Sequence, residues 1–121
     1  MNNPVQWFEI ATIDLERAKN FYAKVFMLEF QFIEMPDSKM YMFGAPNMVG
    51  SAGALVHSGE SKPSADGTLI YFTCEDVDNQ LERVVEAGGK LLIPKTDIGE
   101  FGFYAHCIDS EGNKIGLHSN T

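Results

Sequence analysis

The sequence predicts an α+β fold made of two βαβββ modules in one chain. The first observation is an internal repeat. Shifting the chain by 62 positions, the distance from Asp14 to Asp76, places "WFEIATIDLERAKNFYAKVF" on "LIYFTCEDVDNQLERVVEAG". In both copies a short apolar strand leads into a helix with one apolar face. Strand-like segments separated by turn residues then follow each helix.

Each predicted helix begins after an aspartate, Asp14 or Asp76, whose carboxylate can accept hydrogen bonds from the free N–H groups of the first turn. The second helix is expected to stop at Gly88-Gly89. Apolar residues recur at helical spacing in both segments and predict one buried face for each helix. These residues are Leu15, Ala18, Phe21, Tyr22, Val25 and Phe26 in the first helix, and Val77, Leu81, Val84 and Val85 in the second.

Six strand-like segments follow the helices and complete the two modules. They are "LEFQFIEM", "KMYMF" and "AGALV" in the first half, and "KLLIP", "FYAHCI" and "KIGLH" in the second. The segments "GAPNMVGS" and "KTDIGEFG" are expected to be loops, and the polar "HSGESKPSADG" a linker. We therefore expect a single domain over 1–121, with module 1 at about 4–57, the linker at about 58–67 and module 2 at about 68–119.

Composition restricts the possible partners and location of the chain. Its 121 residues are 45% hydrophobic and 21% charged, which is typical of a globular domain with a sizeable core. Nine basic against seventeen acidic residues give a net charge of −8, which argues against nucleic acid as a partner. We expect no signal peptide and no membrane span. Cys74 and Cys107 lack metal-type spacing and are expected to be reduced thiols in a cytoplasmic protein.

Three motifs stand out beside the repeat: "DLERAKNFY" in the first helix, "EDVD" before the second, and "DSEGNKIGL" near the end. They resemble the vicinal oxygen chelate superfamily, which includes glyoxalase I, bleomycin-resistance proteins and extradiol dioxygenases, and the last is similar to the family pattern "D-P-D-G-N-x-I-E-L". The resemblance covers nearly the whole chain. It implies that the two modules form a cupped mixed sheet with the helices on its outer face.

The resemblance also implies where a metal would be held. Enzymes of this superfamily bind a divalent metal in the cup through side chains of the first and last strand of each module. The matching positions here are Trp7, Ala54, Leu69 and Gly116. A catalytic site needs about three protein ligands from His, Asp, Glu or Cys, and none of these four residues supplies one. We therefore predict no metal and no cofactor, and we expect Gly116 to leave space in the cup.

Strand alternation separates a face under the helices from a face toward the cup. Apolar residues suited to packing under the helices are Phe8, Ile10, Ile70, Phe72, Ile115 and Leu117. The opposite face carries Trp7, Glu9, Leu69, Tyr71, Gly116 and His118. Mixed aromatic and polar character is typical of a small-molecule pocket, so Trp7, Tyr71 and Gly116 are candidate substrate-binding residues. Tyr104, a further candidate, shares one face of its strand with His106, and the sequence leaves open which face turns inward.

Glu9 and His118 are the candidate catalytic residues, because a carboxylate and an imidazole can be tuned toward neutrality. Three interpretations stay open: a structural hydrogen-bonded pair or rim residues, a general base or ligand-orienting pair, and an unusual metal site. In each of them we expect the two side chains to lie near each other in one concave site.

Apolar residues outside the cup predict self-association. Met27, Leu28, Phe30 and Phe32 cluster just after the first helix, and contiguous apolar patches normally mark interfaces. The resemblance also implies pairing of subunits around the cup, so we expect a homodimer. Methionines gather around the hairpin of the first module, where they are core filler, an interface or an adaptable pocket wall. They include Met35, Met40, Met42 and Met48.

Two functions compete. The first is a metal-free module that binds a small hydrophobic or aromatic compound in the cup, as the resemblance to the bleomycin-resistance branch implies. The second is a glyoxalase- or dioxygenase-type lyase, isomerase or oxygenase with an unusual site. The absent ligands favour the first, whereas Glu9 and His118 favour the second.

Overall fold

The computed structural model describes residues 3–45 and 47–121 and has the predicted βαβββ order twice. The first module contains β1 (Trp7–Ala11), α1 (Leu15–Phe26), β2 (Gln31–Met35), β3 (Ser38–Phe43) and β4 (Ala52–Ser58). The second contains β5 (Tyr71–Thr73), α2 (Val77–Glu86), β6 (Lys90–Asp97), the 3-10 turn η1 (Gly99–Phe101), β7 (Phe103–Ile108) and β8 (Lys114–Ser119). The α+β fold class is confirmed.

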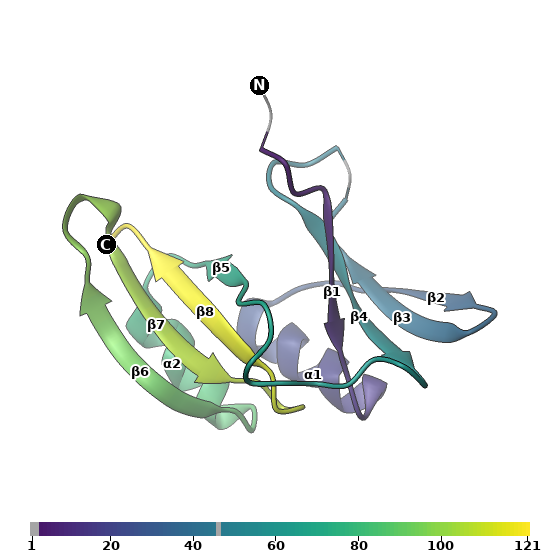
Figure 1. The fold of residues 1–121 in the computed structure, drawn as a ribbon. Coiled ribbons are helices and arrows are strands. Elements are labelled where there is room, and N and C mark those ends of the chain that lie inside the picture. Colours follow the sequence, from purple (N-terminus) through teal and green to yellow (C-terminus); the bar gives the residue numbers. More distant parts are fainter. Residues whose placement is uncertain (1–2, 46) are drawn as a thin grey trace.

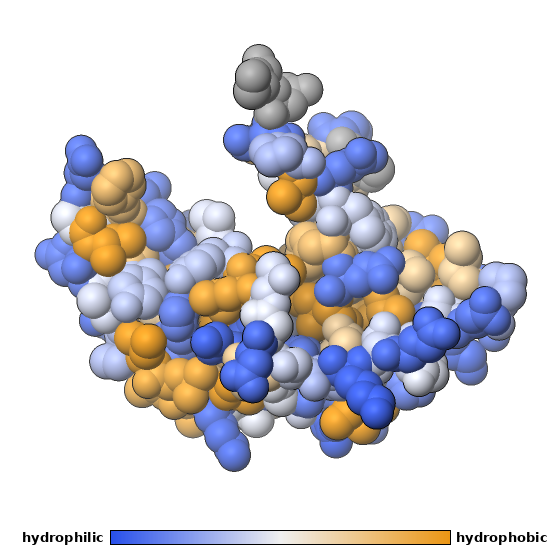
Figure 2. All heavy atoms as spheres, in the orientation of Figure 1, coloured by the Kyte–Doolittle hydropathy of each residue, from blue (hydrophilic) through white to orange (hydrophobic). Residues whose placement is uncertain are grey.

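Each module forms a mixed four-stranded sheet, with the orders β1-β4-β3-β2 and β5-β8-β7-β6. The first and last strands of each module pair in parallel, and the other pairs are antiparallel. Figure 1 shows the two sheets side by side, with both helices on the same side of them. On the other side the molecular surface is hollowed between the sheets, as the space-filling view in Figure 2 shows.

Both predicted helix starts are confirmed. The Asp14 carboxylate accepts a hydrogen bond from the Arg17 backbone N–H at 3.1 Å, and the Asp76 carboxylate accepts one from the Asp78 backbone N–H at 3.0 Å. Each cap satisfies a first-turn donor that has no partner within the helix. The helices therefore begin where the sequence predicts, and their apolar faces are turned to the sheets.

The core lies between the helices and the sheet faces predicted to pack under them. Its buried members include Phe21, Tyr22 and Val25 from α1, Val77 and Val84 from α2, and Ile10, Ile115 and Leu117 from the strands. Phe8, Ile70 and Phe72 pack against this cluster and are partly buried. The Phe8 and Phe72 rings meet edge to face with centroids 6.3 Å apart, so the core is continuous across the two modules. The opposite strand faces are thereby left toward the hollow.

The turn in "DSEGN" joins the second module to the first helix. Asp109 accepts a hydrogen bond from the Tyr22 hydroxyl at 2.6 Å. The Glu111 side chain is fully buried and accepts hydrogen bonds from the backbone N–H groups of Ile13 and Asp14, at 2.8 and 2.7 Å. Arg17 completes the contact, with its Nε 2.7 Å from a Glu111 oxygen. The motif therefore holds the two modules in place relative to each other.

Several element bounds differ from those expected. β4 continues through His57, which pairs with Lys39 of β3, where the linker was expected to begin. The segment read as a loop over 95–102 instead extends β6 to Asp97, because Thr96 and Asp97 still pair with β7, and then forms η1. Pro94 is tolerated there because β6 is an edge strand. Among the described residues, no helix is both long and apolar enough to cross a membrane.

Candidate functional site

Three residues from three adjacent strands form a row across the second sheet. Tyr71 of β5 pairs with Gly116 of β8, and Gly116 pairs on its other side with His106 of β7. In the next row, His118 lies between Thr73 and Tyr104. Paired residues point to the same face of a sheet. Tyr104 and His106 therefore share the face of Tyr71, Gly116 and His118, which settles the orientation that the sequence left open.

Gly116 does not leave empty space, and this corrects the expectation from the sequence. The Tyr71 ring lies directly over the glycine, so that a Cβ atom there would be 2.6 Å from Tyr71 Cε2 and 2.8 Å from Cγ. The ring reaches across β8, and its hydroxyl oxygen is 2.7 Å from Nε2 of His106. The glycine is therefore needed for the close approach of an aromatic ring, which is one of the established uses of glycine in a strand.

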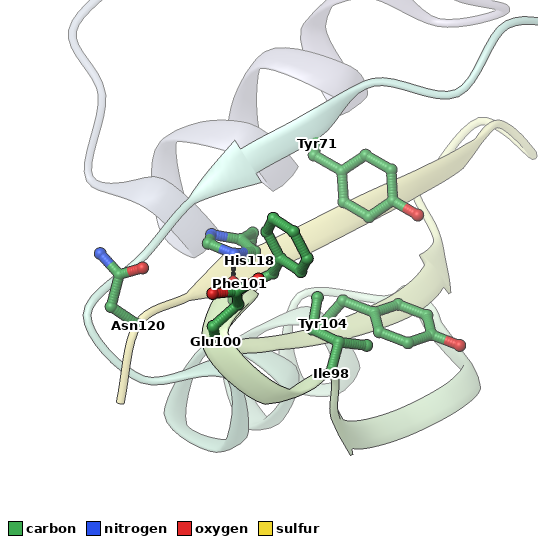
Figure 3. Close-up of a pocket in the computed structure, with 7 residues that line it drawn as sticks. All are labelled: Tyr71, Ile98, Glu100, Phe101, Tyr104, His118 and Asn120. Atoms are coloured by element: carbon green, nitrogen blue, oxygen red, sulfur yellow. Dashed lines mark hydrogen bonds between the residues drawn. The ribbon is translucent and has the colours of Figure 1, made fainter.

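A cavity of about 660 Å³ opens beside this row, and Figure 3 shows the side chains around it. It is lined by Tyr71, Ile98, Glu100, Phe101, Tyr104, His118 and Asn120. Aromatic and aliphatic walls with a few polar groups are characteristic of small-molecule sites. The site therefore combines residues of β5, β7 and β8 with the β6–β7 connection.

Sequence reasoning missed the contribution of the β6–β7 connection to the cavity. Ile98, Glu100 and Phe101 come from this connection, for which the sequence predicts only a loop. The flanking Gly99 and Gly102 have φ of +70° and +95°, a backbone conformation that other residues rarely adopt. The two glycines near Phe101 are the feature of the sequence from which a fold-back toward the end of β8 could have been predicted.

His118 holds that connection in place. Its Nε2 atom is 2.5 Å from the backbone carbonyl oxygen of Phe101. Because a carbonyl can only accept, the imidazole donates from Nε2, and in a neutral ring this leaves Nδ1 without a proton. Phe101 itself is 68% exposed, so its side chain is available to a ligand. His118 therefore fixes one wall of the cavity through the backbone and also lines the cavity.

Glu9 and His118 are not hydrogen-bonded to each other. Glu9 accepts a hydrogen bond from the Trp7 indole N–H at 3.1 Å, and the partner of His118 is the Phe101 carbonyl. Glu9 also lines a different cavity, of about 280 Å³, together with Lys62, Asn113 and other residues. His118 does not line that cavity. The indole, two residues away on the same face of β1, supplies the nearer donor.

His106 has an electrostatic environment that favours its neutral form. Partial burial, in the first place, and the positive charge of Lys114 on β8 lower the pKa of the His106 imidazole below its usual value. An uncharged ring has one protonated and one unprotonated nitrogen. The Nε2 atom that faces Tyr71 can therefore act as an acceptor.

The donor set at the positions implied by the family resemblance does not fit a metal. Trp7, Ala54, Leu69 and Gly116 offer no side-chain carboxylate, imidazole or thiolate. Elsewhere in residues 3–45 and 47–121, no group of three or more His, Cys, Asp or Glu side chains is arranged to hold an ion.

Known proteins resemble this chain over nearly its full length. The family model described as Glyoxalase/Bleomycin resistance protein/Dioxygenase superfamily matches residues 5–117. Two curated relatives, from Mycobacterium bovis and Mycobacterium tuberculosis, are named "Putative glyoxylase CFP32"; each is 28% identical over 116 residues. The match covers 92% of this chain and 43% of either relative, so the chain spans less than half their length.

Solved structures show the same fold. A mutant of glyoxalase I from Zea mays superposes with a TM-score of 0.77 at 22% identity, over 97% of this chain and 46% of that one. A glyoxylase/bleomycin resistance protein/dioxygenase domain from Frankia sp. EAN1pec also has a TM-score of 0.77, at 14% identity, with 100% of both chains covered.

Proposed function

Because the chain belongs to the Glyoxalase/Bleomycin resistance protein/Dioxygenase superfamily, we propose that it binds a small hydrophobic or aromatic compound in the cavity beside η1, without a metal. The observation that carries the proposal is the lining of that cavity. The rings of Tyr71, Phe101 and Tyr104 offer flat apolar contact, and the neighbouring His118 and Asn120 can orient a polar group.

The residues at the family's ligand positions support the metal-free part of the proposal. Gly116 has no side-chain atom that could bind a metal, and the Tyr71 ring covers it. Trp7 directs its indole N–H to Glu9 and offers an aromatic face instead of a ligand atom. A ligand in the cavity beside η1 would therefore be held by stacking and hydrogen bonds and not through a metal ion.

Binding can be tested with two neutral aromatic probes, indole and benzofuran, followed through amide shifts in NMR titrations. We expect saturable shifts concentrated at residues 98–104 and 116–120. Phe101→Ala should weaken binding about ten-fold, as expected for the loss of a stacked ring. Val85→Ala is the matched control, because Val85 is also an exposed apolar residue, at 56%, but lies on α2 away from the cavity. Shifts scattered over the surface, or equal affinity in both variants, would contradict the proposal.

The alternative is a glyoxalase- or dioxygenase-type lyase, isomerase or oxygenase with an unusual site. The observation in its favour is that His106 and His118 share one face of the second sheet, His106 opposite Gly116 on β7 and His118 two residues beyond Gly116 on β8. Metal analysis of the purified protein separates the two functions. Tightly bound zinc, nickel, iron or manganese at one ion per chain, lost in a His106→Ala or His118→Ala variant, would favour the enzyme.

We also propose that the protein is a cytoplasmic homodimer that binds neither nucleic acid nor membranes. Cys74 and Cys107 are both free thiols, in keeping with a reducing compartment. The expected apolar patch is only partly exposed: Met27 is 75% and Phe32 48% exposed, whereas Leu28 and Phe30 pack partly against the core. Light scattering at micromolar concentration should give twice the mass of one chain, and Phe32→Lys should lower it.

A further inference from the structure

We propose that the Tyr71 hydroxyl, oriented by His106, is a hydrogen-bond acceptor for the ligand, so that the cavity selects aromatic compounds that carry an N–H or O–H donor. The inference rests on the proposed function and specifies its ligand class. It is carried by the row of Tyr71, Gly116 and His106 across three strands and by the place of Tyr71 in the cavity wall.

The position of the hydroxyl is restrained at both ends of the tyrosine side chain. The ring is in contact with the backbone of Gly116, and the hydroxyl is held 2.7 Å from His106 Nε2. The Tyr104 ring packs edge to face against His106, with ring centroids 5.2 Å apart, and this contact restrains the imidazole. A restrained polar group loses little freedom when a ligand binds, so it can discriminate between ligands.

The chemistry of the two groups sets the direction of their hydrogen bond. A phenol is a good donor, and its oxygen is a weaker acceptor because a lone pair is delocalised into the ring. An unprotonated imidazole nitrogen is a good acceptor. Partial burial and the Lys114 charge both disfavour the imidazolium form of His106, which would otherwise donate to the oxygen. The Tyr71 hydroxyl therefore donates to Nε2, and its oxygen keeps lone pairs for a second partner.

The Tyr71 side chain is open to a ligand. Tyr71 is 47% exposed and lines the cavity, whereas His106 does not. Figure 3 shows the hydroxyls of Tyr71 and Tyr104 pointing to the same side of the cavity, while Glu100, His118 and Asn120 gather away from them. Donation to His106 polarises the Tyr71 oxygen and strengthens it as an acceptor. An N–H or O–H group on the ligand would complete the chain of hydrogen bonds, and an acceptor-only ligand would face unmatched lone pairs.

Indole and benzofuran test this selection because they have nearly the same shape. Indole has an N–H donor where benzofuran has a ring oxygen. We expect the protein to bind indole about five-fold more tightly than benzofuran, which is the effect of one neutral hydrogen bond. Tyr71→Phe, which keeps the ring over Gly116, should bring the ratio to about one. Tyr41→Phe, which removes a hydroxyl from the first module outside the cavity, should leave the ratio unchanged. A ratio near one in the unmodified protein, or the same preference in Tyr71→Phe, would overturn the inference.

The protonation of His106 gives a second readout that needs no ligand. Long-range proton–nitrogen correlation NMR at neutral pH should show a protonated Nδ1 and an unprotonated Nε2, with the Nε2 resonance moving in Tyr71→Phe. A proton on Nε2 would reverse the hydrogen bond and refute the inference. If neither probe binds, the proposed function fails for neutral aromatics, and the tautomer of His106 still decides whether Tyr71 presents an acceptor.

Discussion

Replacing Gly116 with alanine should destabilise the protein, because the added methyl group meets the ring of Tyr71. The new Cβ would be 2.6 Å from Cε2 and 2.8 Å from Cγ, well inside the usual separation of about 3.5–4.0 Å between carbon atoms. Either the ring stays and the site is overpacked, or the ring moves and the hydroxyl leaves His106. The sequence alone favoured the opposite outcome, since it predicted empty space at this position.

The magnitude follows from one cost and one opposing gain. If the ring stays, overpacking costs about 1–3 kcal/mol, and if the ring moves, losing the Tyr71–His106 hydrogen bond costs about 1 kcal/mol. Replacing glycine also reduces the entropy of the unfolded chain, which restores about 0.4–1 kcal/mol. With the ring in place, mid-range values of about 2 and about 0.7 kcal/mol leave a net loss of roughly 1.3 kcal/mol in the free energy of unfolding, or a fall in melting temperature of roughly 4–8 °C. If the ring moves instead, the net loss is smaller.

Urea unfolding and calorimetry of four variants would measure this effect. Gly67→Ala is the matched control, because nothing lies within 4 Å of a Cβ atom there and its φ is not positive, so it should be neutral or slightly stabilising. In a Tyr71→Ala background the obstructing ring is gone, and Gly116→Ala should cost nothing further. An unchanged melting temperature in Gly116→Ala alone, or an undiminished cost in the Tyr71→Ala background, would refute the reasoning.

Three further predictions concern other parts of the chain. Burial opposes ionisation of Glu111, but the hydrogen bonds that it accepts outweigh burial and lower its pKa below 4.5. The stability that the Glu111 carboxylate contributes is therefore complete above pH 4.5 and is lost as the pH falls through the lowered pKa. Glu111→Gln should cost about 1–3 kcal/mol at pH 7 and weaken the acid sensitivity of urea unfolding, and a parallel acid profile would contradict this. Burial raises the pKa of the Cys107 thiol to about 12, so Cys107 should react with a thiol reagent at pH 8 only when urea unfolds the protein. Cys74 should be labelled first, and mass spectrometry of the digested protein can show the order. His118→Ala should speed amide hydrogen exchange over 98–102, because it removes the donor to the Phe101 carbonyl; equal protection in the two proteins would argue against this role.

The fold was predictable because its signals are local and repeated. Asp14 and Asp76 act within the first turn of their own helices, and the alternation of apolar residues needs only the strand in which it occurs. The helix caps and the apolar alternation occur twice, 62 positions apart. This repeat predicts two modules without any knowledge of contacts between distant parts of the chain.

The candidate site was less predictable because its contacts cross strands. The glycine in β8 signalled a close approach, but the approaching group depends on the register that places Tyr71 and His106 on either side of Gly116. The cavity wall at Phe101 depends on how the β6–β7 connection folds back to His118. The predicted pairing of Glu9 with His118 needed the relative position of two sheets, which strand alternation within each sheet does not determine.

The contact between the "DSEGN" turn and the first helix has a consequence for synthesis on the ribosome. Glu111 binds the backbone N–H groups of Ile13 and Asp14, 98 and 97 positions earlier in the chain. The start of the first helix therefore receives its partner only after the chain as far as Glu111 has left the exit tunnel. The first module can form its helix and hairpin early, but its final packing has to wait until the "DSEGN" turn of the second module has been made.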